Sequence, residues 1–516
     1  MNIHSEKILI IDFGSQTTQL IARRVREQKV YCEIHPYHTD LAKIKELNPS
    51  GLILSGGPRS VYDKGAPKCD PALFHLDLPI LGICYGAQLM VQELGGVVEQ
   101  AAKREFGKSF LDIEYYGGLF ANFDKSNEEC QVWMSHGDRI EKLPDNFSAS
   151  AQSEHSPYAS IRHESRPLVG VQFHPEVAHT LIGTDVLRNF LFTLCNCQPS
   201  WTMGSFIDTT VEAIQQKVGD DQVICALSGG VDSAVTAALI HRAIGDQLTC
   251  IYVNNGLMRT NETASLLKFF DETTHLKVID VHATDYFLSE LDGIIDPEIK
   301  RKKIGFGFIK IFEEEAKKLG DVKYLAQGTL YPDVIESVAL DGGTVIKSHH
   351  NVGGLPEIMK LDLIEPLREL FKDEVRLLGL ELGLPDEAVF RQPFPGPGLG
   401  IRIMGEVTGE RLDILRQADV IVLEEMKKSG WYNKVWQSFA VLLPIQTVGV
   451  MGDERTYENV IALRCVDSLD AMTADWSKLP YELIGRISNR IINEVRGVNR
   501  VVFDVSSKPP STIEWE

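Results

Sequence analysis

An apolar run leads into a small, glycine-rich turn in the stretch Gln222-Val223-Ile224-Cys225-Ala226-Leu227-Ser228-Gly229-Gly230-Val231-Asp232-Ser233. A helical pattern follows through Ile240, and a second apolar run occupies residues 248–253. Strands that alternate with helices predict a parallel sheet, in which ligands bind at the carboxyl ends of the strands. Ser228 falls at such an end. The stretch therefore predicts both an α/β fold and the place of a binding site.

The turn from Ser228 to Ser233 suits an anion. Its glycines and small side chains leave backbone N–H groups and two hydroxyls facing the start of a helix. It lacks the Lys of the G-x-x-x-x-G-K-[ST] loop, and Asp232 disfavours bare phosphate, so the turn implies a divalent cation. A chance Ser/Gly turn is the alternative interpretation.

This turn resembles the PP-loop of the ATP pyrophosphatases, which split ATP between its α and β phosphates. The resemblance implies an ATP site, with Mg²⁺ at Asp232. Its seven residues are Ser228, Gly229, Gly230, Val231, Asp232, Ser233 and Ala234. That family includes asparagine, argininosuccinate and NAD synthetases and tRNA thiolases, so the loop indicates a reaction type and leaves the substrate open.

A second motif, Gly82-Ile83-Cys84-Tyr85-Gly86, follows an apolar strand far upstream. Glycines on both sides of Cys84 relieve the crowding of a tight strand-to-helix elbow. A thiol there lies near a helix amino terminus, whose dipole favours thiolate. A buried structural cysteine is the alternative.

Two further segments supply what a cysteine nucleophile needs. His174-Pro175-Glu176 offers an imidazole to move a proton and a carboxylate to orient it. Ser55-Gly56-Gly57-Pro58 follows a strand, and the backbone N–H groups of Gly57 and Tyr85 are candidate oxyanion donors. Each segment taken singly has a plain alternative: a loop histidine beside a surface glutamate for the first, and an ordinary turn for the second.

Together with Asp12-Phe13-Gly14-Ser15-Gln16, these motifs resemble the class I glutamine amidotransferase domain over roughly residues 7 to 195. The resemblance implies that Cys84 attacks the glutamine amide, that His174 shuttles the proton and that Glu176 orients His174. Ammonia is then the product that leaves.

Two segments nearer the carboxyl end bear on the substrate. Residues 346–356 form a basic, glycine-rich segment, in which Lys347, His349 and His350 suit a mobile lid over phosphates. Metal ligation by the two histidines and a plain surface loop are the alternatives. The tail Lys508-Pro509-Pro510-Ser511-Thr512-Ile513-Glu514-Trp515-Glu516 is rigid and aromatic, whereas termini are usually frayed, so we expect it to dock into a site.

Over essentially the whole chain, the sequence resembles the bacterial glutamine-hydrolysing GMP synthetase family. The resemblance rests on five features in this order: the amidotransferase motifs, the PP-loop, the predicted lid, the Pro-Phe-Pro-Gly-Pro-Gly-Leu segment and the tail. The resemblance implies synthesis of GMP from xanthosine 5'-monophosphate (XMP), ATP and glutamine, with XMP bound by Lys508, Thr512 and Glu514. It also implies a homodimer formed through the carboxyl-terminal domain. Asn254 and Ser511 depart from the family pattern, where many relatives have Asp and Gly. Another glutamine-dependent PP-loop ligase, such as an NAD synthetase, and a catalytically silent nucleotide-binding regulator are the alternatives.

Composition sets the remaining expectations. The 516 residues are predicted to form an amidotransferase domain over 1–197, a PP-loop domain over 198–390 and an α+β dimerisation domain over 391–516. The first two are predicted to be parallel-sheet α/β domains.

A net charge of −20 argues against nucleic-acid or anionic-membrane partners. Nine scattered cysteines indicate free thiols, and with no secretion signal or membrane span we expect a reducing, cytoplasmic location.

Overall fold

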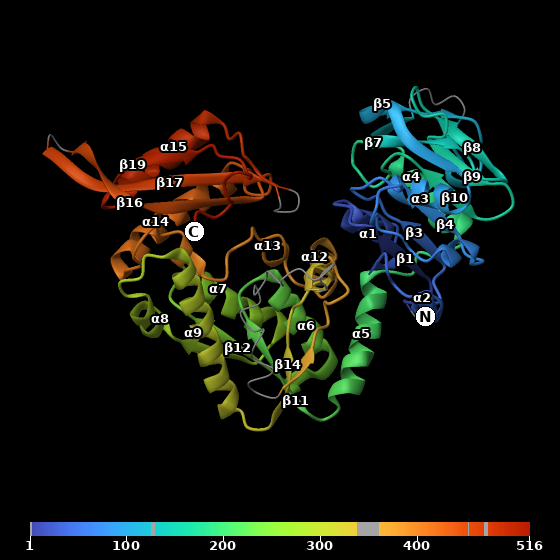
Figure 1. Ribbon diagram of the computed structural model, residues 1–516. Helices are drawn as coiled ribbons and strands as arrows, with labels where there is room; N and C mark the ends of the chain where they lie inside the picture. Colours follow the sequence, from blue (N-terminus) through green and yellow to red (C-terminus); the bar gives the residue numbers. More distant parts are fainter. Residues whose placement is uncertain (1–2, 125–129, 338–360, 452–453, 469–472) are drawn as a thin grey trace. The chain divides into compact units, whose positions relative to one another are not determined.

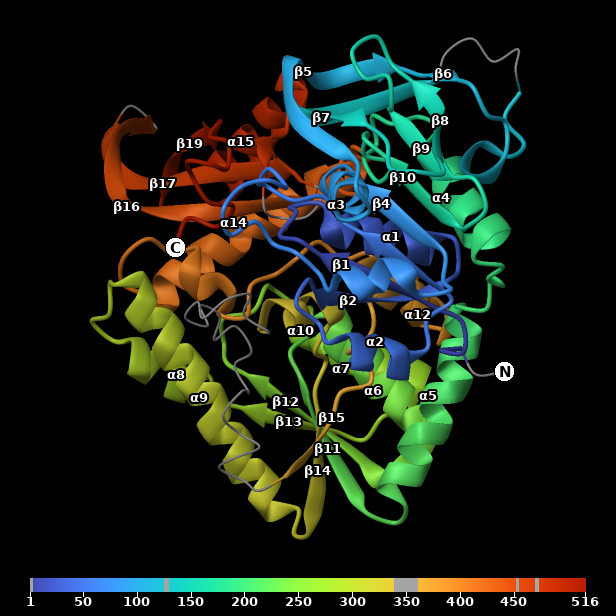
Figure 2. The same cartoon turned by 45° about the vertical axis from the view of Figure 1, so that its right-hand side comes forward.

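The computed structural model describes residues 3–124, 130–337, 361–451, 454–468 and 473–516. The chain forms two compact units, of which the first contains Met1–Thr209 and the second begins at Thr210. Figures 1 and 2 show their helices and strands.

The first unit is built on an eight-stranded sheet with the order β2-β1-β3-β4-β10-β9-β8-β6. Its strands are β1 (Lys7–Asp12), β2 (Tyr31–Pro36), β3 (Gly51–Leu54), β4 (Ile80–Ile83), β6 (Asp112–Ile113), β8 (Phe147–Gln152), β9 (Ser160–His163) and β10 (Leu168–Val171). The five from β2 to β10 run parallel, and the rest are antiparallel. Strands β3, β4 and β10 are buried throughout, as strands covered on both faces must be.

The helices of this unit follow the parallel strands. They are α1 (Thr18–Glu27), α2 (Leu41–Leu47), α3 (Tyr85–Glu93) and α4 (Gly183–Asn189). The sequence predicts one closing helix over 185–197, whereas α4 gives way to a π turn over Phe190–Leu194. A separate two-stranded ribbon, β5 (Val97–Phe110) with β7 (Gln131–Lys142), completes the unit and was not predicted.

The second unit contains a five-stranded, fully parallel sheet with the order β13-β12-β11-β14-β15. Its strands are β11 (Gln222–Leu227), β12 (Leu248–Asn254), β13 (Val278–His282), β14 (Val322–Ala326) and β15 (Asp362–Ile364). Its helices are α6 (Val231–Ile244), α7 (Glu262–Phe269), α8 (Thr284–Leu291), α9 (Pro297–Lys318), α12 (Lys372–Glu381) and α13 (Asp386–Val389). Two further helices, α5 (Met203–Val218) and α10 (Tyr331–Ser337), contain residues assigned to both units. The predicted loop therefore lies between β11 and α6, at the carboxyl edge of the sheet.

The same unit continues into a mainly antiparallel sheet, in which only β19 runs parallel to its neighbour β17. Its elements are α14 (Gly409–Lys428), β16 (Gln437–Met451), β17 (Glu454–Asp467), β18 (Asp475–Trp476), α15 (Tyr481–Glu494) and β19 (Val498–Asp504). One apolar core runs from Ile224 of the parallel sheet to Ile461 of this one. The predicted fold class, two parallel α/β sheets followed by an α+β part, is confirmed, while the bounds of the three predicted domains stay predictions.

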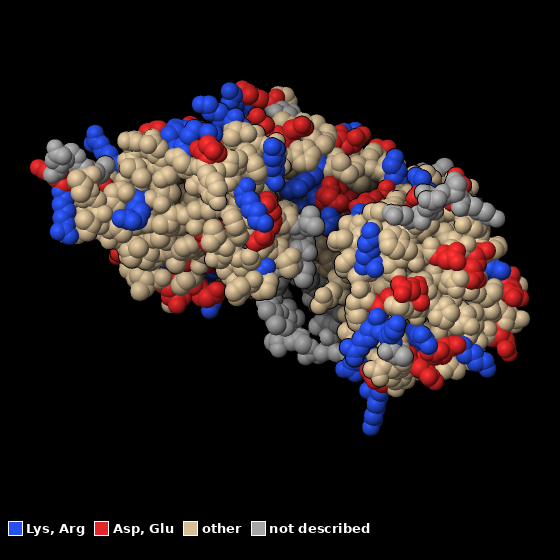
Figure 3. Space-filling model, turned by 90° about the horizontal axis from the view of Figure 1, so that it is seen from above, with Lys and Arg blue, Asp and Glu red and all other residues tan. Residues whose placement is uncertain are grey.

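The surface and the cysteines bear on the compositional expectations. On the face seen in Figure 3, Lys and Arg side chains are interspersed with Asp and Glu side chains. All nine cysteines are free, and all but the half-buried Cys195 are buried, as predicted. Within the described ranges, no helix has the length and apolar character that crossing a membrane requires.

Candidate active sites

Cys84 lies on a tight elbow between β4 and α3. Its φ of +48° is a left-handed value that residues with a side chain rarely adopt. The flanking glycines make the elbow possible: a Cβ at Gly82 would lie 2.6 Å from Ala87 backbone atoms, and one at Gly86 would lie 2.4 Å from the Leu54 carbonyl oxygen. The prediction that these glycines relieve crowding is confirmed.

Cys84 is 7% exposed and lies at the amino terminus of α3. Its Sγ donates a long hydrogen bond of 3.9 Å to the main-chain oxygen of Ser135, on β7. The Cys84 amide in turn donates to Val171 at 2.8 Å. The ribbon that sequence reasoning missed therefore forms one wall of the thiol site.

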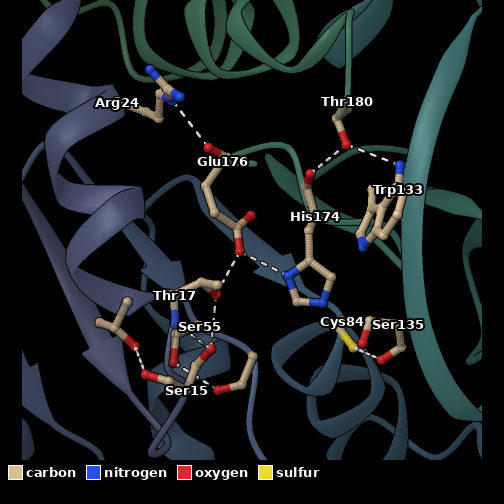
Figure 4. Close-up of polar contacts among 12 residues, drawn as sticks. Ser15, Thr17, Arg24, Ser55, Cys84, Trp133, Ser135, His174, Glu176 and Thr180 are labelled. Carbon is tan, nitrogen blue, oxygen red and sulfur yellow. Dashed lines mark hydrogen bonds and ion pairs between the residues drawn. The ribbon is translucent and has the colours of Figure 1, made fainter. Parts of the chain in front are cut away.

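His174 and Glu176 form a buried acid–base pair just beyond β10. His174 Nδ1 lies 2.7 Å from Glu176 Oε1, and the Glu176 side chain is fully buried. The main chain of His174 is fixed as well, because its amide donates to Trp133 and its carbonyl accepts from Thr180 at 2.6 Å. Figure 4 shows the imidazole between the Glu176 carboxylate and the Cys84 thiol.

The electrostatics of this pair favour a charged imidazole. Burial by itself lowers the pKa of His174, but hydrogen bonds with Cys84 and Glu176, and the negative charges of both, raise the pKa to about 10. His174 is therefore protonated at neutral pH and has a proton to give to a leaving amine.

The segment Ser55-Gly56-Gly57 lies against both sides of the site. A Cβ placed on Gly56 would lie 3.4 Å from His174 Cε1, and one on Gly57 would lie 3.0 Å from the ring of Tyr85. Tyr85 is the first residue of α3 and directly follows the thiol. Gly57 and Tyr85, the two predicted oxyanion donors, are thus neighbours beside Cys84.

The phosphate loop, Ser228 to Ala234, joins β11 to α6. Ser228 and Gly230 are exposed, and the two serine hydroxyls, of Ser228 and Ser233, lie 3.1 Å apart. Asp232 in the first turn of α6 is ion-paired with Lys372 of α12, whose ammonium lies 2.6 and 2.5 Å from the two carboxylate oxygens. Sequence reasoning missed Lys372, because a lone Lys that starts a helix carries no motif.

A cavity of about 330 Å³ opens beside this loop. The cavity is lined by the loop, by mainly apolar side chains and by three cations, Lys372, Arg376 and Arg391. The other lining residues are Ala226, Leu227, Ile251, Tyr252, Val253, Met258, Phe308, Ile309, Phe312, Gln392, Pro393, Phe394, Pro395 and Gly396. The proline-rich segment at the start of the predicted carboxyl-terminal domain therefore lines part of this cavity.

Arg391, a second residue that the motifs missed, links that segment to the loop. It donates to the Gly229 carbonyl at 2.9 Å and is ion-paired with Glu262. Burial, and then the charge of Arg259, lower the pKa of Arg391 to about 10. Arg391, Arg259 and Arg402 all lie over the Phe394 ring, at 5.7, 4.8 and 5.1 Å from its centroid. Three arginines therefore gather around Phe394, which lines the cavity.

The carboxyl-terminal tail is docked, as its rigidity predicts. Glu514 accepts from the fully buried Arg402 at 3.1 and 2.8 Å and from Gln437 at 2.8 Å. Thr512 accepts from the buried Arg464 through its carbonyl, at 3.0 Å. Lys508 exchanges two main-chain hydrogen bonds with Ala474, of 2.7 and 3.1 Å. Because Arg402 contacts both Phe394 and Glu514, the tail approaches the cavity wall.

The sequence also singles out the predicted lid residues and two residues that depart from the family pattern. Lys347, His349 and His350, the predicted lid residues, lie outside the described residues. Asn254 ends β12, where its side chain accepts from the Gly256 amide at 3.1 Å. The Ser511 hydroxyl donates to the Ser507 carbonyl at 2.9 Å. These two departures therefore make local turn contacts.

Comparison with family models assigns both ends of the chain. The model described as "Glutamine amidotransferase class-I" matches residues 9–194, and the one described as "GMP synthase C terminal domain" matches residues 424–515. A model described as "tRNA methyl transferase HUP domain" matches residues 221–274, which include the phosphate loop.

Curated relatives match the whole chain. A "GMP synthase [glutamine-hydrolyzing]" of Desulfotalea psychrophila is 71% identical, with 100% of both chains covered. Two proteins of the same name are also similar. The one from Maridesulfovibrio salexigens is 57% identical, with 99% of this chain and 100% of the relative covered. The one from Brachyspira hyodysenteriae is 56% identical, with 100% of both chains covered. On this full-length similarity, the chain belongs to the family of glutamine-hydrolysing GMP synthases.

Proposed function

We propose that this GMP synthase divides its reaction between two sites. Glutamine is hydrolysed at Cys84, and the ammonia released is used at the phosphate loop, where XMP is activated by ATP. The observation that carries the proposal is the buried His174–Glu176 pair, 2.7 Å apart, beside a thiol held on a strained elbow. A structural cysteine needs neither the strain nor the paired imidazole.

At the first site, Cys84 reacts as the thiolate of a thiolate–imidazolium pair with His174, and its Sγ attacks the side-chain carbonyl carbon of glutamine. The oxyanion that forms accepts hydrogen bonds from the Gly57 and Tyr85 amides. His174 gives its proton to the amide nitrogen, the C–N bond breaks, and ammonia and a thioester result. Water then adds to the thioester, His174 takes up a proton from the water, and glutamate leaves. Glu176 orients the imidazole throughout.

At the second site, the C2 oxygen of XMP attacks the α-phosphorus of ATP. The bond to the β-phosphate breaks, pyrophosphate leaves, and an adenylated XMP forms. Ammonia attacks C2, AMP leaves with the oxygen, and loss of a proton gives GMP. The Ser228–Ala234 loop at the start of α6 suits the pyrophosphate, with Lys372 as a counter-charge.

A magnesium ion accompanying ATP fits this loop. No group of three or more His, Cys, Asp or Glu side chains gathers as a metal cage in the described ranges. Mg²⁺ typically takes only one or two carboxylates and completes its shell with water and phosphate oxygens, so Asp232 suffices as a protein ligand. When bound, the ion screens the phosphate charge; Lys372 then pairs with phosphate oxygens as well as with Asp232.

We place XMP at the tail. Glu514 is held by Arg402 and Gln437, and Lys508, Thr512 and Glu514 supply a cation, a hydroxyl and a carboxylate for the phosphate and base. The contact of Arg402 with Phe394, a wall of the nucleotide cavity, supports this placement because the two nucleotides must meet.

A second copy of the chain is the proposed partner. Figure 1 shows β16 and β17 extending past α14, and these strands carry Val448, 44% exposed, opposite Tyr457, 56% exposed. Val450, 76% exposed, continues the same face. Such a face favours burial against its own copy. Sedimentation of Val450→Asp should give monomer where the native chain gives dimer; a dimeric variant would contradict this interface.

The nine free thiols support a reducing, cytoplasmic location.

One experiment tests the division of labour. Cys84→Ala should abolish GMP formation with glutamine as nitrogen donor and retain it with added ammonium salt. GMP, AMP and pyrophosphate are measured with XMP and ATP present in both arms. Equal loss of the two activities would overturn the proposal.

A further inference from the structure

The Glu176 carboxylate has a second donor besides His174. Thr17 Oγ1 donates to Glu176 Oε1 at 2.7 Å, the same oxygen that meets His174 Nδ1 at 2.7 Å. The two residues are 159 positions apart in the chain. Figure 4 shows Thr17 and His174 on either side of this oxygen.

Thr17 occupies a position where its hydroxyl has an ordinary use. It is the N-cap residue of α1, and a threonine there usually accepts a hydrogen bond from the helix backbone. In this chain the N-cap side chain makes no such bond. The hydroxyl instead reaches across the fold to Glu176, so α1 forgoes a stabilising cap.

The direction of the Thr17 hydrogen bond follows from a count of protons. An ionised carboxylate only accepts, so the one hydroxyl proton of Thr17 goes to Glu176. Ser15 Oγ, 2.9 Å from Thr17 Oγ1, is then the donor to Thr17. A row of hydrogen bonds thus leads from Ser15 through Thr17 to the carboxylate.

The other described contacts of Glu176, apart from that with His174, do not orient its carboxylate. Arg24 Nε donates to the main-chain oxygen of Glu176 at 3.0 Å and fixes the backbone only. Glu176 Oε2 is buried and has no hydrogen-bond partner among the described residues. Without Thr17, His174 is the one side-chain donor left in the described structure to hold the carboxylate.

We propose that Thr17 is a positioning residue of the glutamine-hydrolysing site, which acts on Cys84 through Glu176 and His174. The inference rests on the proposed role of Cys84 as nucleophile. A hydrogen bond to a charged, buried acceptor is among the stronger ones in proteins, and it keeps the Glu176 carboxylate facing the imidazole. Loss of the bond weakens the hold of Glu176 on the imidazolium, so His174 loses its proton at a lower pH.

The test compares Thr17→Val, which removes the hydroxyl at nearly constant shape, with Thr17→Ser, which keeps it. Thr39→Val is the matched control, because Thr39 also donates a hydrogen bond of 2.7 Å, but to the Pro36 carbonyl. Glutamine hydrolysis is measured from pH 6 to pH 10.5 for each variant, together with ammonia-dependent GMP synthesis.

We expect kcat for glutamine hydrolysis to fall by about tenfold to a hundredfold in Thr17→Val, the range for loss of a hydrogen bond to a charged group. The alkaline limb of its pH profile should also move to lower pH. Thr17→Ser and Thr39→Val should retain the native profile, and ammonia-dependent synthesis should be unchanged in all three.

The inference would be overturned by an unshifted alkaline limb in Thr17→Val, or by an equal loss of glutamine hydrolysis in Thr17→Ser. A parallel loss of ammonia-dependent synthesis would also overturn it, since it would mean general damage to the fold. Failure of the proposed function itself looks different, because Cys84→Ala would then still hydrolyse glutamine.

Discussion

Lys372 brings to the phosphate loop the cation that the loop's own sequence lacks, with its ammonium 2.6 and 2.5 Å from the two oxygens of Asp232. The pair links the first turn of α6 to the start of α12. Both residues line the nucleotide cavity. The loop and α12 therefore act together on an anionic ligand.

Lys372→Met should raise KM for ATP in ammonia-dependent synthesis by about tenfold or more, because a charge-assisted contact to phosphate is lost. Glutamine hydrolysis without nucleotides should not change. Initial rates over a range of ATP concentrations measure the effect. Lys323→Met is the control, since Lys323 pairs with Asp221 on the surface at 2.8 Å; a KM for ATP equal in the two variants would contradict the prediction.

The charge of His174 predicts how activity depends on pH. Burial lowers the pKa of His174, but its hydrogen bonds with Cys84 and Glu176 raise it to about 10. Hydrolysis of glutamine needs the protonated imidazole, so its rate should fall as the pH rises through about 10. Ammonia-dependent synthesis, measured in the same buffers, should not follow this fall; a shared alkaline limb would contradict the assignment.

The same shift predicts a dependence of stability on pH. The pKa of His174 rises on folding from 6.5 to about 10, so its contribution is complete below pH 6.5 and is lost as the pH rises from there to about 10. Urea unfolding should show a steeper decline over this window in the native chain than in His174→Gln. Parallel curves would rule out the shift.

Gly86→Ala should lower the free energy of unfolding by about 3 kcal/mol, at the upper end for overpacking. The added Cβ would lie 2.4 Å from the Leu54 carbonyl oxygen, which belongs to a buried strand and has little room to move. Gly137→Ala is the control, because its nearest neighbour would be 3.9 Å away. Denaturant titration of both variants is the measurement, and similar midpoints would show that the elbow adapts.

Glu514→Ala should destabilise the carboxyl-terminal sheet by about 3 kcal/mol or more, since it leaves a buried Arg402 without its carboxylate partner. Glu514→Gln keeps an acceptor, so we expect it to retain more of the stability while KM for XMP rises. Thermal unfolding and XMP titration separate the two effects. Unaltered XMP affinity in Glu514→Gln would remove this residue from the proposed XMP site.

Much of the fold can be predicted because its strands and helices have local patterns. The apolar run Gly51–Leu54 forms β3, and the periodic run Gly409–Lys428 forms α14. Strands buried on both faces require continuous apolar residues. The ribbon strand β5 has no such run: it carries Lys103, Arg104 and Glu105 in a row, and sequence patterning gives it no strand signal.

A local pattern also separates the site residues that the sequence can predict from those that it cannot. Cys84 and the phosphate loop can be found because glycines at fixed spacing mark a tight turn. Lys372 and Thr17 cannot, since each is a single residue without a local pattern. They reach their partners from 140 and 159 positions away, and only the folded chain brings them there.

The backbone of Cys84, at φ +48°, has a consequence for the history of such a chain. Glycine adopts this conformation freely, whereas a residue with a Cβ is strained there by about 1–3 kcal/mol. A Cys84→Gly mutation would therefore remove the nucleophile and relieve strain at once. Where free ammonia is plentiful, drift toward an inactive elbow is downhill in stability, and only selection for the use of glutamine keeps the cysteine in place.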